Sequence, residues 1–178
     1  MSHIMLDLET LGVRPGCKIL SIGACAFHHQ WGLGNTFYRE IKRDFQGQLH
    51  EDPDTLIWWN KQNPTVRDAT LNDAEHKVMI LEALIDFAEW LKPMGNVWMW
   101  GNGADFDNVI IAEVYRVFGL PLPWGKFNNR CYRTLKSSFP GVKSPEFIGT
   151  KHNALDDAKH QARHAVQILK VAKEKGIL

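Results

Sequence analysis

The feature that most constrains the fold of this chain is an apolar run at residues 19–27, which reads ILSIGACAF. A run this apolar is typical of a strand that lies inside a sheet and is covered by other elements. We therefore expect residues 18–27 to form a central strand.

Shorter patterns place further elements before and after this strand. Strands are predicted at residues 3–9, 35–41 and 97–100. Helices are predicted from Pro53 onward and at residues 72–92, 106–118, 130–138 and 154–175. The helix at 72–92 is expected to begin with a capping box, Asn72-Asp73-Ala74-Glu75. The order of these elements indicates an α/β fold in which helices pack on a mixed sheet.

Length and charge limit the classes of protein to consider. The chain has 178 residues, which fits one domain over residues 1–178, and 44% of them are hydrophobic. Its formal net charge is only +1. A protein that grips duplex nucleic acid through the phosphates alone carries a strong positive field, so that class is excluded. Any handling of nucleic acid should be local and assisted by a metal.

The three cysteines, Cys17, Cys25 and Cys131, are odd in number and form no C-x-x-C pair. Neither a disulfide framework nor a zinc site is therefore expected, and the reducing cytoplasm is the predicted location. The first residues contain no basic segment, and no apolar run approaches ~20 residues. We expect neither a signal peptide nor a membrane span.

Two acids, Asp7 and Glu9, end the first predicted strand. Residues two apart in a strand point to the same face, so the two carboxylates should lie close together. Such a pair is unfavourable as bare charges and becomes favourable around a divalent cation. The D-x-E pattern is common on its own, and the alternative is a pair of solvated acids in a turn.

Two further motifs lie where helices are predicted to begin. The segment GNGADFD at residues 101–107 contains Asp105, which we expect to act as a helix cap, and Asp107. Asp107 is better placed for a site because Phe106 beside it can anchor the turn in the core. The segment HNALDDA at residues 152–158 places His152 five residues before Asp157. Taken alone, each motif is explained by helix capping.

Together, the three motifs predict a metal site. Hard oxygen ligands such as the carboxylates of Asp7, Glu9, Asp107 and Asp157 suit Mg²⁺ or Mn²⁺ rather than zinc. Four carboxylates can hold two such ions ~4 Å apart, which is the spacing that stabilises an in-line phosphoryl displacement. The sequence therefore predicts a phosphoryl-transfer site with two Mg²⁺ or Mn²⁺ ions.

The motifs D-x-E-T at residues 7–10, F-D at 106–107 and H-x-A-x-x-D-A at 152–158 resemble those of the DEDDh branch of the DnaQ-like 3′→5′ exonucleases. The resemblance spans about residues 3–172. It implies an RNase H-like fold and the release of nucleoside 5′-monophosphates from a 3′ end. It also implies that the four acids bind the metals and that His152 is the general base. Histidine, with an ordinary pKa of ~6.5, suits that task.

A narrower resemblance is to the exoribonuclease AS-like group, which includes bacterial exoribonucleases and phage or prophage exonucleases. It rests on Trp58-Trp59, Trp100-Gly101, the segment DFDN at residues 105–108 and the segment RCYRT at residues 130–134. The expected substrate is a 3′ end of single-stranded RNA or DNA. The group contains RNA and DNA enzymes, so both stay open, with RNA slightly favoured. The resemblance also implies a homodimer.

Five residues are expected to bind substrate: Thr10, Leu11, Trp59, Asn108 and Arg133. Adjacent residues on a helix point ~100° apart, so one tryptophan of the Trp58-Trp59 pair should be buried and the other should face the cleft. We expect Trp59 in the cleft, where it would stack on a base. Arg133 and Arg130 would hold phosphate, unless they are solvated surface charges.

Two rival functions are weighed. A phosphatase of the haloacid dehalogenase type also has paired acids after its first strand, but its pattern is D-x-D, whereas Glu9 takes the second position here. A catalytically weak nucleic-acid-binding module could share the exonuclease fold. Against this module stand the complete set of expected acids with His152 and the small net charge.

Overall fold

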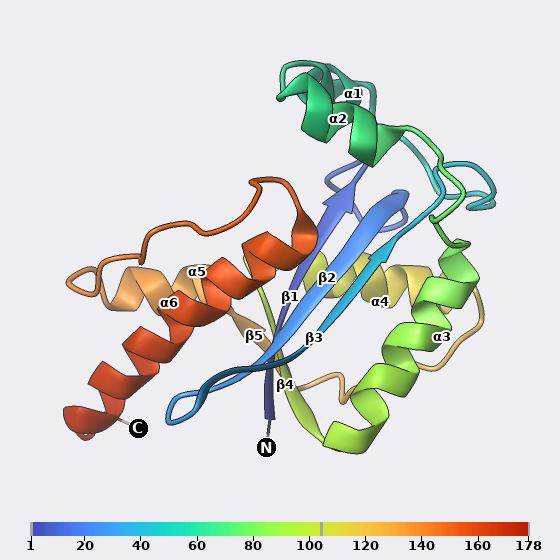
Figure 1. Ribbon diagram of the computed structural model, residues 1–178. Helices are drawn as coiled ribbons and strands as arrows, with labels where there is room; N and C mark the ends of the chain where they lie inside the picture. The colour runs from blue at the N-terminus through green and yellow to red at the C-terminus, as the bar shows by residue number, and fades with distance from the viewer. Residues whose placement is uncertain (1, 104, 178) are drawn as a thin grey trace.

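The computed structural model describes residues 2–103 and 105–177, and its centre is a five-stranded sheet with the order β3-β2-β1-β4-β5 (Figure 1). The strands are β1 Ser2–Thr10, β2 Ile19–His28, β3 Gly32–Glu40, β4 Val97–Gly101 and β5 Asn129–Cys131. β1 pairs antiparallel with β2 and parallel with β4, so the sheet is mixed. The apolar run lies in β2, which has a neighbour on each side, as predicted.

Helices cover both faces of the sheet (Figure 1). α6 (Ala154–Glu174) lies across β1 and β2, with α5 (Tyr132–Ser138) beside it. α3 (Ile80–Leu91), followed by the short 3₁₀ helix η1 (Lys92–Met94), and α4 (Asp107–Val117) cover the opposite face. α1 (Pro53–Asn60) and α2 (Pro64–Leu71) stand beyond the end of β1. This is the predicted RNase H-like arrangement of a mixed sheet flanked by helices.

Alternation along β1 determines which face receives the acids. Leu6 and Leu8 are buried in the core under α3 and α4, whereas Met5 is buried in the core under α6. Because successive side chains of a strand point to opposite faces, Asp7 shares the α6 face with Met5. α6 covers this face of β1, and it also covers the same face of the neighbouring strand, β2.

Gly23 of β2, which pairs with Asp7, permits α6 to approach the sheet closely. A Cβ atom at Gly23 would overlap the backbone of Ala154 and Leu155, the first residues of α6. The absent side chain therefore brings the start of α6 close to the sheet, next to Asp7.

Two predicted helices are wrong in their bounds, and β3 begins at Gly32 rather than at residue 35. α3 begins at Ile80 rather than at Asn72, because Asn72 ends α2, and the Asp73 carboxylate accepts hydrogen bonds from the backbone of Arg43 and Asp44 instead of capping a helix. α2 itself, capped by the side chain of Asn63, was not predicted. The predicted helix at 130–138 begins at Tyr132, because residues 129–131 pair with β4 as a three-residue strand.

The cysteines agree with the prediction that none is bridged. All three are free, and Cys17 and Cys25 are buried in the core. Across the parts of the chain that the structure describes, no helix combines the length and apolar character needed to cross a bilayer.

Candidate active site

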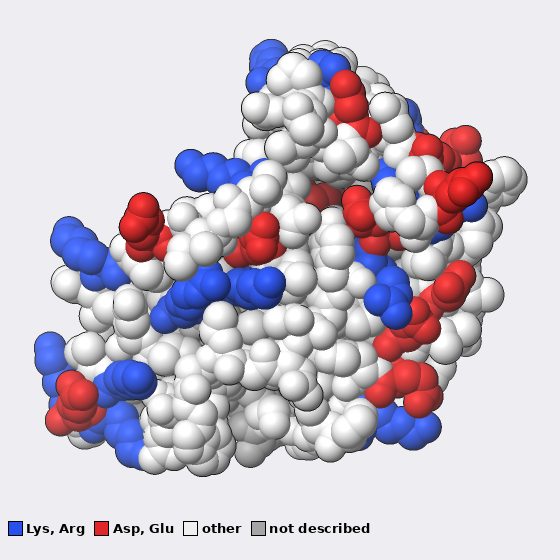
Figure 2. Space-filling model, in the orientation of Figure 1, with Lys and Arg blue, Asp and Glu red and all other residues white. Residues whose placement is uncertain are grey.

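A cleft of about 820 Å³ opens at the end of β1, between the sheet and α1. Asp7, Glu9 and Asp157 line it, and Asp107 is buried directly beside them, with its neighbour Phe106 in the lining. These four carboxylates, from β1, α4 and α6, are called the acidic floor below. Figure 2 shows acidic side chains within the hollow beneath the α1–α2 region, and it shows Lys and Arg dispersed among acids elsewhere on that face.

Backbone amides hold two members of the acidic floor. The Asp107 carboxylate accepts hydrogen bonds from the N–H groups of Leu8 (3.2 Å) and Asn102 (2.9 Å), which ties α4 to β1 and to the end of β4. Asp157 accepts one from the N–H of His152 at 2.8 Å. Asp105, predicted as the cap of this helix, does not cap it, because Phe106 occupies the cap position and no side chain caps the helix.

Burial raises the pKa of every acid in the floor, and repulsion from other floor acids adds to it for Asp7 and Glu9. Burial is the main cause, and it raises the pKa of Glu9 to about 8 and that of Asp107 to about 6. The pKa of Asp7 lies well above its usual range, because burial is joined by the charges of Asp107, Glu9 and Asp157. The pKa of Asp157 is also raised by burial. The site therefore lacks positive charge that would balance four carboxylates.

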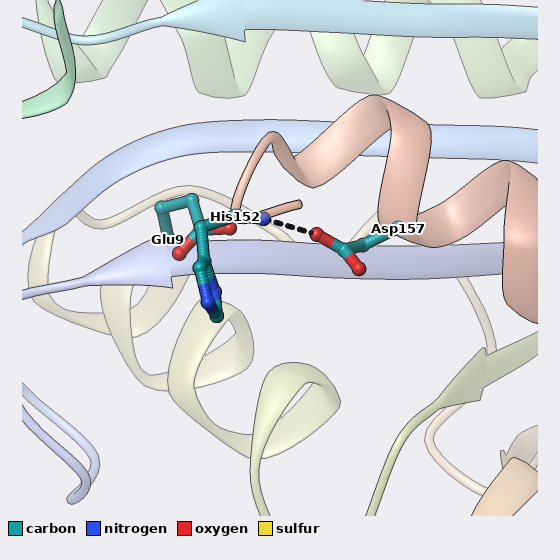
Figure 3. A group of neighbouring side chains, drawn as sticks. All are labelled: Glu9, His152 and Asp157. Carbon is teal, nitrogen blue, oxygen red and sulfur yellow. Dashed lines mark hydrogen bonds between the residues drawn. The ribbon is translucent and has the colours of Figure 1, made fainter. Parts of the chain in front are cut away.

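His152 stands over this floor at the end of the loop that leads into α6. Its ring, the Glu9 carboxylate and the Asp157 carboxylate each offer an atom within 4.8 Å of the others (Figure 3). The residue has a positive φ of 62°, which is uncommon for a side chain other than glycine. The ring also meets the edge of Trp58, with centroids 5.0 Å apart. The loop thus fixes the imidazole between the acids and α1.

The side of the cleft opposite the acids is called the α1 wall, and it consists of residues 12–14, 52–55 and 58–59. Here the prediction about the tryptophan pair is wrong in its choice of residue. Trp59 is 1% exposed, because its indole N–H donates to the carbonyl of Thr10 (3.0 Å) and its ring packs on Leu20. Trp58 is 42% exposed and is the tryptophan that offers a free ring surface to the cleft.

Of the other predicted substrate residues, only Thr10 lines the cleft, where its hydroxyl donates to the carbonyl of Gly12 at 2.7 Å. Leu11 is fully buried against Trp59, and Asn108 is buried with its amide bound to the carbonyl of Met99. The predicted substrate contacts of these two side chains are therefore not supported, because both point into the core.

The two arginines of the predicted phosphate site lie outside the cleft lining. Arg133 is exposed and donates to the carbonyl of Asn102 at 2.7 Å, close enough that its charge lowers the pKa of Asp107. The guanidinium of Arg130 lies 3.5 Å from the ring centre of Trp98. A phosphate contact by Arg133 stays a prediction.

Among the cleft residues that were not predicted, two have side chains that form hydrogen bonds with acids of the lining. Gln161 lines the cleft and donates a hydrogen bond to Asp7, and Arg14 lines its mouth, bound to Asp52. A signal existed for Gln161, since it follows Asp157 by four residues and so shares its face of α6. No local pattern marks Arg14.

The residues present fit divalent cations. Carboxylate oxygens are the ligands that Mg²⁺ and Mn²⁺ prefer. The raised pKa values mark an excess of negative charge that such ions would neutralise. The close grouping of Glu9, His152 and Asp157 also shows that ligand atoms of separate motifs converge.

Two solved nuclease structures share the fold of this chain. The nuclease domain of 3′hExo, a DEDDh family member, superposes with a TM-score of 0.65 at 15% identity, over 96% of this chain and 92% of that one. Cell-death related nuclease 4 (CRN-4) gives 0.60 at 13% identity, over 98% of this chain and 64% of that one. At these identities the likeness establishes the fold. No curated protein matches the sequence.

The model of a sequence family covers nearly the whole chain. Residues 2–169 match the family described as the 3′-5′ exoribonuclease Rv2179c-like domain. This range contains all three acidic motifs and His152. The chain therefore belongs to the 3′-5′ exoribonuclease Rv2179c-like domain family, and it is a 3′→5′ exonuclease.

Proposed function

We propose that this chain is a Mg²⁺- or Mn²⁺-dependent exonuclease that removes nucleoside 5′-monophosphates from the 3′ end of single-stranded RNA, by a two-metal mechanism with His152 as general base. The observation that carries the proposal is the convergence of acids from β1, α4 and α6 on one cleft, with His152 among them. Taken alone, the Asp7-Glu9 motif is compatible with solvated acids in a turn, and the other two motifs are compatible with helix capping. None of these alternatives explains why all three converge on one cleft.

Asp7, Glu9, Asp107 and Asp157 would hold the ions. When bound, two divalent cations supply Lewis-acid stabilisation of the attacking and leaving oxygens of an in-line displacement. The chain contributes a buried pocket in which charge interactions are stronger than in water. It also contributes carboxylates that are held in place before substrate arrives, because Asp107 is bound by two backbone N–H groups.

His152 would accept a proton from the attacking water. Its ring lies beside Glu9 and Asp157, where the scissile phosphate must sit if the acids bind the metals. Trp58 restricts the ring from the other side through their edge-to-face contact. An imidazole confined in this way suits general-base catalysis.

RNA is favoured over DNA as the substrate for two reasons. The matching family is described as exoribonuclease, and the 3′hExo domain that shares the fold was crystallised with rAMP.

On this chain the exposed ring of Trp58 offers a stacking surface for the terminal base, and Thr10 lines the cleft next to Glu9. Stacking tolerates any base, so this contact adds affinity without sequence preference.

The test uses single-stranded RNA and DNA of one sequence, labelled at the 5′ end, with Mn²⁺, Mg²⁺ or EDTA. We expect a ladder that shortens from the 3′ end, faster on RNA, and is lost with EDTA. Asp107→Asn should abolish the ladder, because it removes a charge of the acidic floor while keeping the size of the side chain. Asp105→Asn is the matched control, since this exposed acid lies two residues away and outside the floor. Equal rates for Asp107→Asn and wild type would contradict the site.

A further inference from the structure

Asp7 differs from Asp107 and Asp157 in what holds it. Those two carboxylates are bound by backbone N–H groups, whereas Asp7 accepts its hydrogen bond from a side chain. The donor is the carboxamide Nε2 of Gln161, at 2.7 Å from Oδ1 of Asp7. The orientation of the Asp7 carboxylate therefore depends on one residue that lies outside the three acidic motifs.

We propose that Gln161 is a positioning residue for the metal site: its carboxamide fixes the Asp7 carboxylate through Oδ1 and leaves Oδ2 free for a divalent cation. The inference rests on the proposed function, since it assigns Asp7 to the metals. It concerns a residue that the acidic motifs do not include and that touches the cleft beside them.

The chemistry of the donor suits this task. The charged groups that raise the pKa of Asp7 are Asp107, Glu9 and Asp157, all of them acids. A lysine or arginine in the position of Gln161 would hold Asp7 as well, but its positive charge would compete with the cations for the same carboxylate. A carboxamide donates a hydrogen bond without a net charge, so it orients Asp7 and does not oppose metal binding.

The packing of α6 on the sheet places both Gln161 and Asp157 beside Asp7. The two residues are four apart on α6 and therefore share one face of that helix. Gly23 lets the start of this helix lie against β2, directly beside Asp7. Gln161 is 6% exposed, so its side chain is confined rather than free to reach other partners.

The other end of the carboxamide indicates that Gln161 does not serve the fold alone. Its Oε1 atom is buried and has no hydrogen-bond partner among the described residues. A buried acceptor without a partner is destabilising. An apolar side chain of similar length would fill the same space without this defect. The hydrogen bond from Nε2 to Asp7 explains why an amide side chain occupies this position.

The first experiment compares Gln161→Met with wild type by calorimetric titration of Mn²⁺ into the metal-free protein. Methionine has a similar length and removes the donor. We expect Mn²⁺ affinity to fall about 10- to 100-fold, the range seen when residues that orient metal ligands are replaced. The melting temperature of the metal-free variant should stay close to that of wild type, because losing the hydrogen bond to Asp7 is destabilising whereas removing the unpaired Oε1 is stabilising. The control is Gln167→Met, an exposed glutamine on the same helix, which should leave both quantities unchanged.

Kinetics give a second readout. The Mn²⁺ concentration for half-maximal RNA cleavage should rise about 10- to 100-fold in Gln161→Met, with kcat at saturating Mn²⁺ within a few-fold of wild type. If the methionine variant does not fold, Gln161→Asn keeps the amide but shortens the side chain so that it no longer reaches Asp7, and the same weakening of Mn²⁺ binding is expected.

The outcomes separate this inference from the proposed function. Unchanged Mn²⁺ affinity in a folded Gln161 variant, with RNA cleavage by wild type intact, would overturn the role of Gln161 and leave the exonuclease proposal standing. A wild-type protein that neither binds Mn²⁺ nor cleaves RNA would overturn the metal-dependent exonuclease proposal and the inference with it.

Discussion

The acidic floor and the α1 wall face each other across one cleft but are built differently. Floor residues are mostly buried, and three of the four carboxylates accept hydrogen bonds from partners on another element or loop. In the α1 wall, by contrast, Val13, Arg14 and Trp58 are exposed, and the Trp58 ring makes edge-to-face contacts with Trp59 and His152. The floor is thus fixed before a substrate binds, whereas the wall can adjust to it.

The difference between the acidic floor and the α1 wall corresponds to two functions, catalysis and substrate binding. Transition-state stabilisation requires charges held in place before the reaction, because reorganising them during the reaction costs free energy. Binding a strand of any sequence requires apolar surface and adaptable contacts instead. We therefore expect changes in the floor to affect kcat and metal binding, and changes in the wall to affect KM. Asp107→Asn, with its complete loss of cleavage, is the largest effect that this comparison predicts.

His152 lies between the two regions and gives the next largest effect. His152→Ala should lower kcat by ~10²–10⁴-fold, the usual contribution of a general base. Mn²⁺ affinity should stay nearly unchanged, because the backbone N–H that holds Asp157 remains in the variant. Single-turnover rates and Mn²⁺ titration measure the two quantities. Full activity of the variant would remove His152 from the mechanism, and a large loss of Mn²⁺ affinity would make it a metal ligand instead.

Trp58→Ala tests the wall. Stacking of an aromatic ring on a base contributes ~1–3 kcal/mol, so KM for single-stranded RNA should rise roughly 5- to 100-fold while kcat changes little. Trp31→Ala is the matched control, since this tryptophan is 80% exposed and stacks on His28 at the turn between β2 and β3. If kcat falls instead of KM rising, Trp58 acts mainly by confining His152, and the separation between wall and floor is weaker than proposed.

The smallest expected effect concerns how the folding stability of the metal-free protein changes with pH. The folded protein keeps a proton on Glu9 up to a pKa of about 8, whereas the unfolded chain loses it near the usual 4.5. Between these two pKa values the folded state binds more protons than the unfolded state, so stability falls as the pH rises from 4.5 to about 8 and levels off above that pH. Between pH 7 and 8.5 the loss should be about 1 kcal/mol, or roughly 2–4 °C in melting temperature.

Thermal unfolding in EDTA measures this slope. Glu9→Gln should reduce this slope, because one titrating group is removed while Asp7 remains, and saturating Mg²⁺ should abolish it in wild type, because cations bind the ionised carboxylates. A melting temperature that is constant or rises over this range would contradict the shifted pKa of Glu9.

Much of the fold and the acidic site was predictable from local patterns. The central strand, the ends of β1 and β4 and the start of α6 follow from apolar runs and from signals such as Asn153, which caps α6. The same patterns failed at residues 72–79, where a plausible capping box lies in a loop because Asp73 binds the backbone near Arg43. A capping motif describes neighbours in sequence, and it is overruled when a distant backbone supplies a better partner.

The sequence by itself determined which reactive groups this site contains, and four acids and a histidine in three motifs predict divalent metals and phosphoryl transfer. Only the tertiary structure decided that Trp58 rather than Trp59 faces the cleft, because a distant carbonyl, that of Thr10, binds the indole of Trp59. It also decided that Gln161 reaches Asp7, through the space that Gly23 leaves for α6. The physical reason is that a sequence motif shows which chemical groups are present. A contact such as that between Gln161 and Asp7, which are 154 positions apart, depends instead on how the helices pack on the sheet.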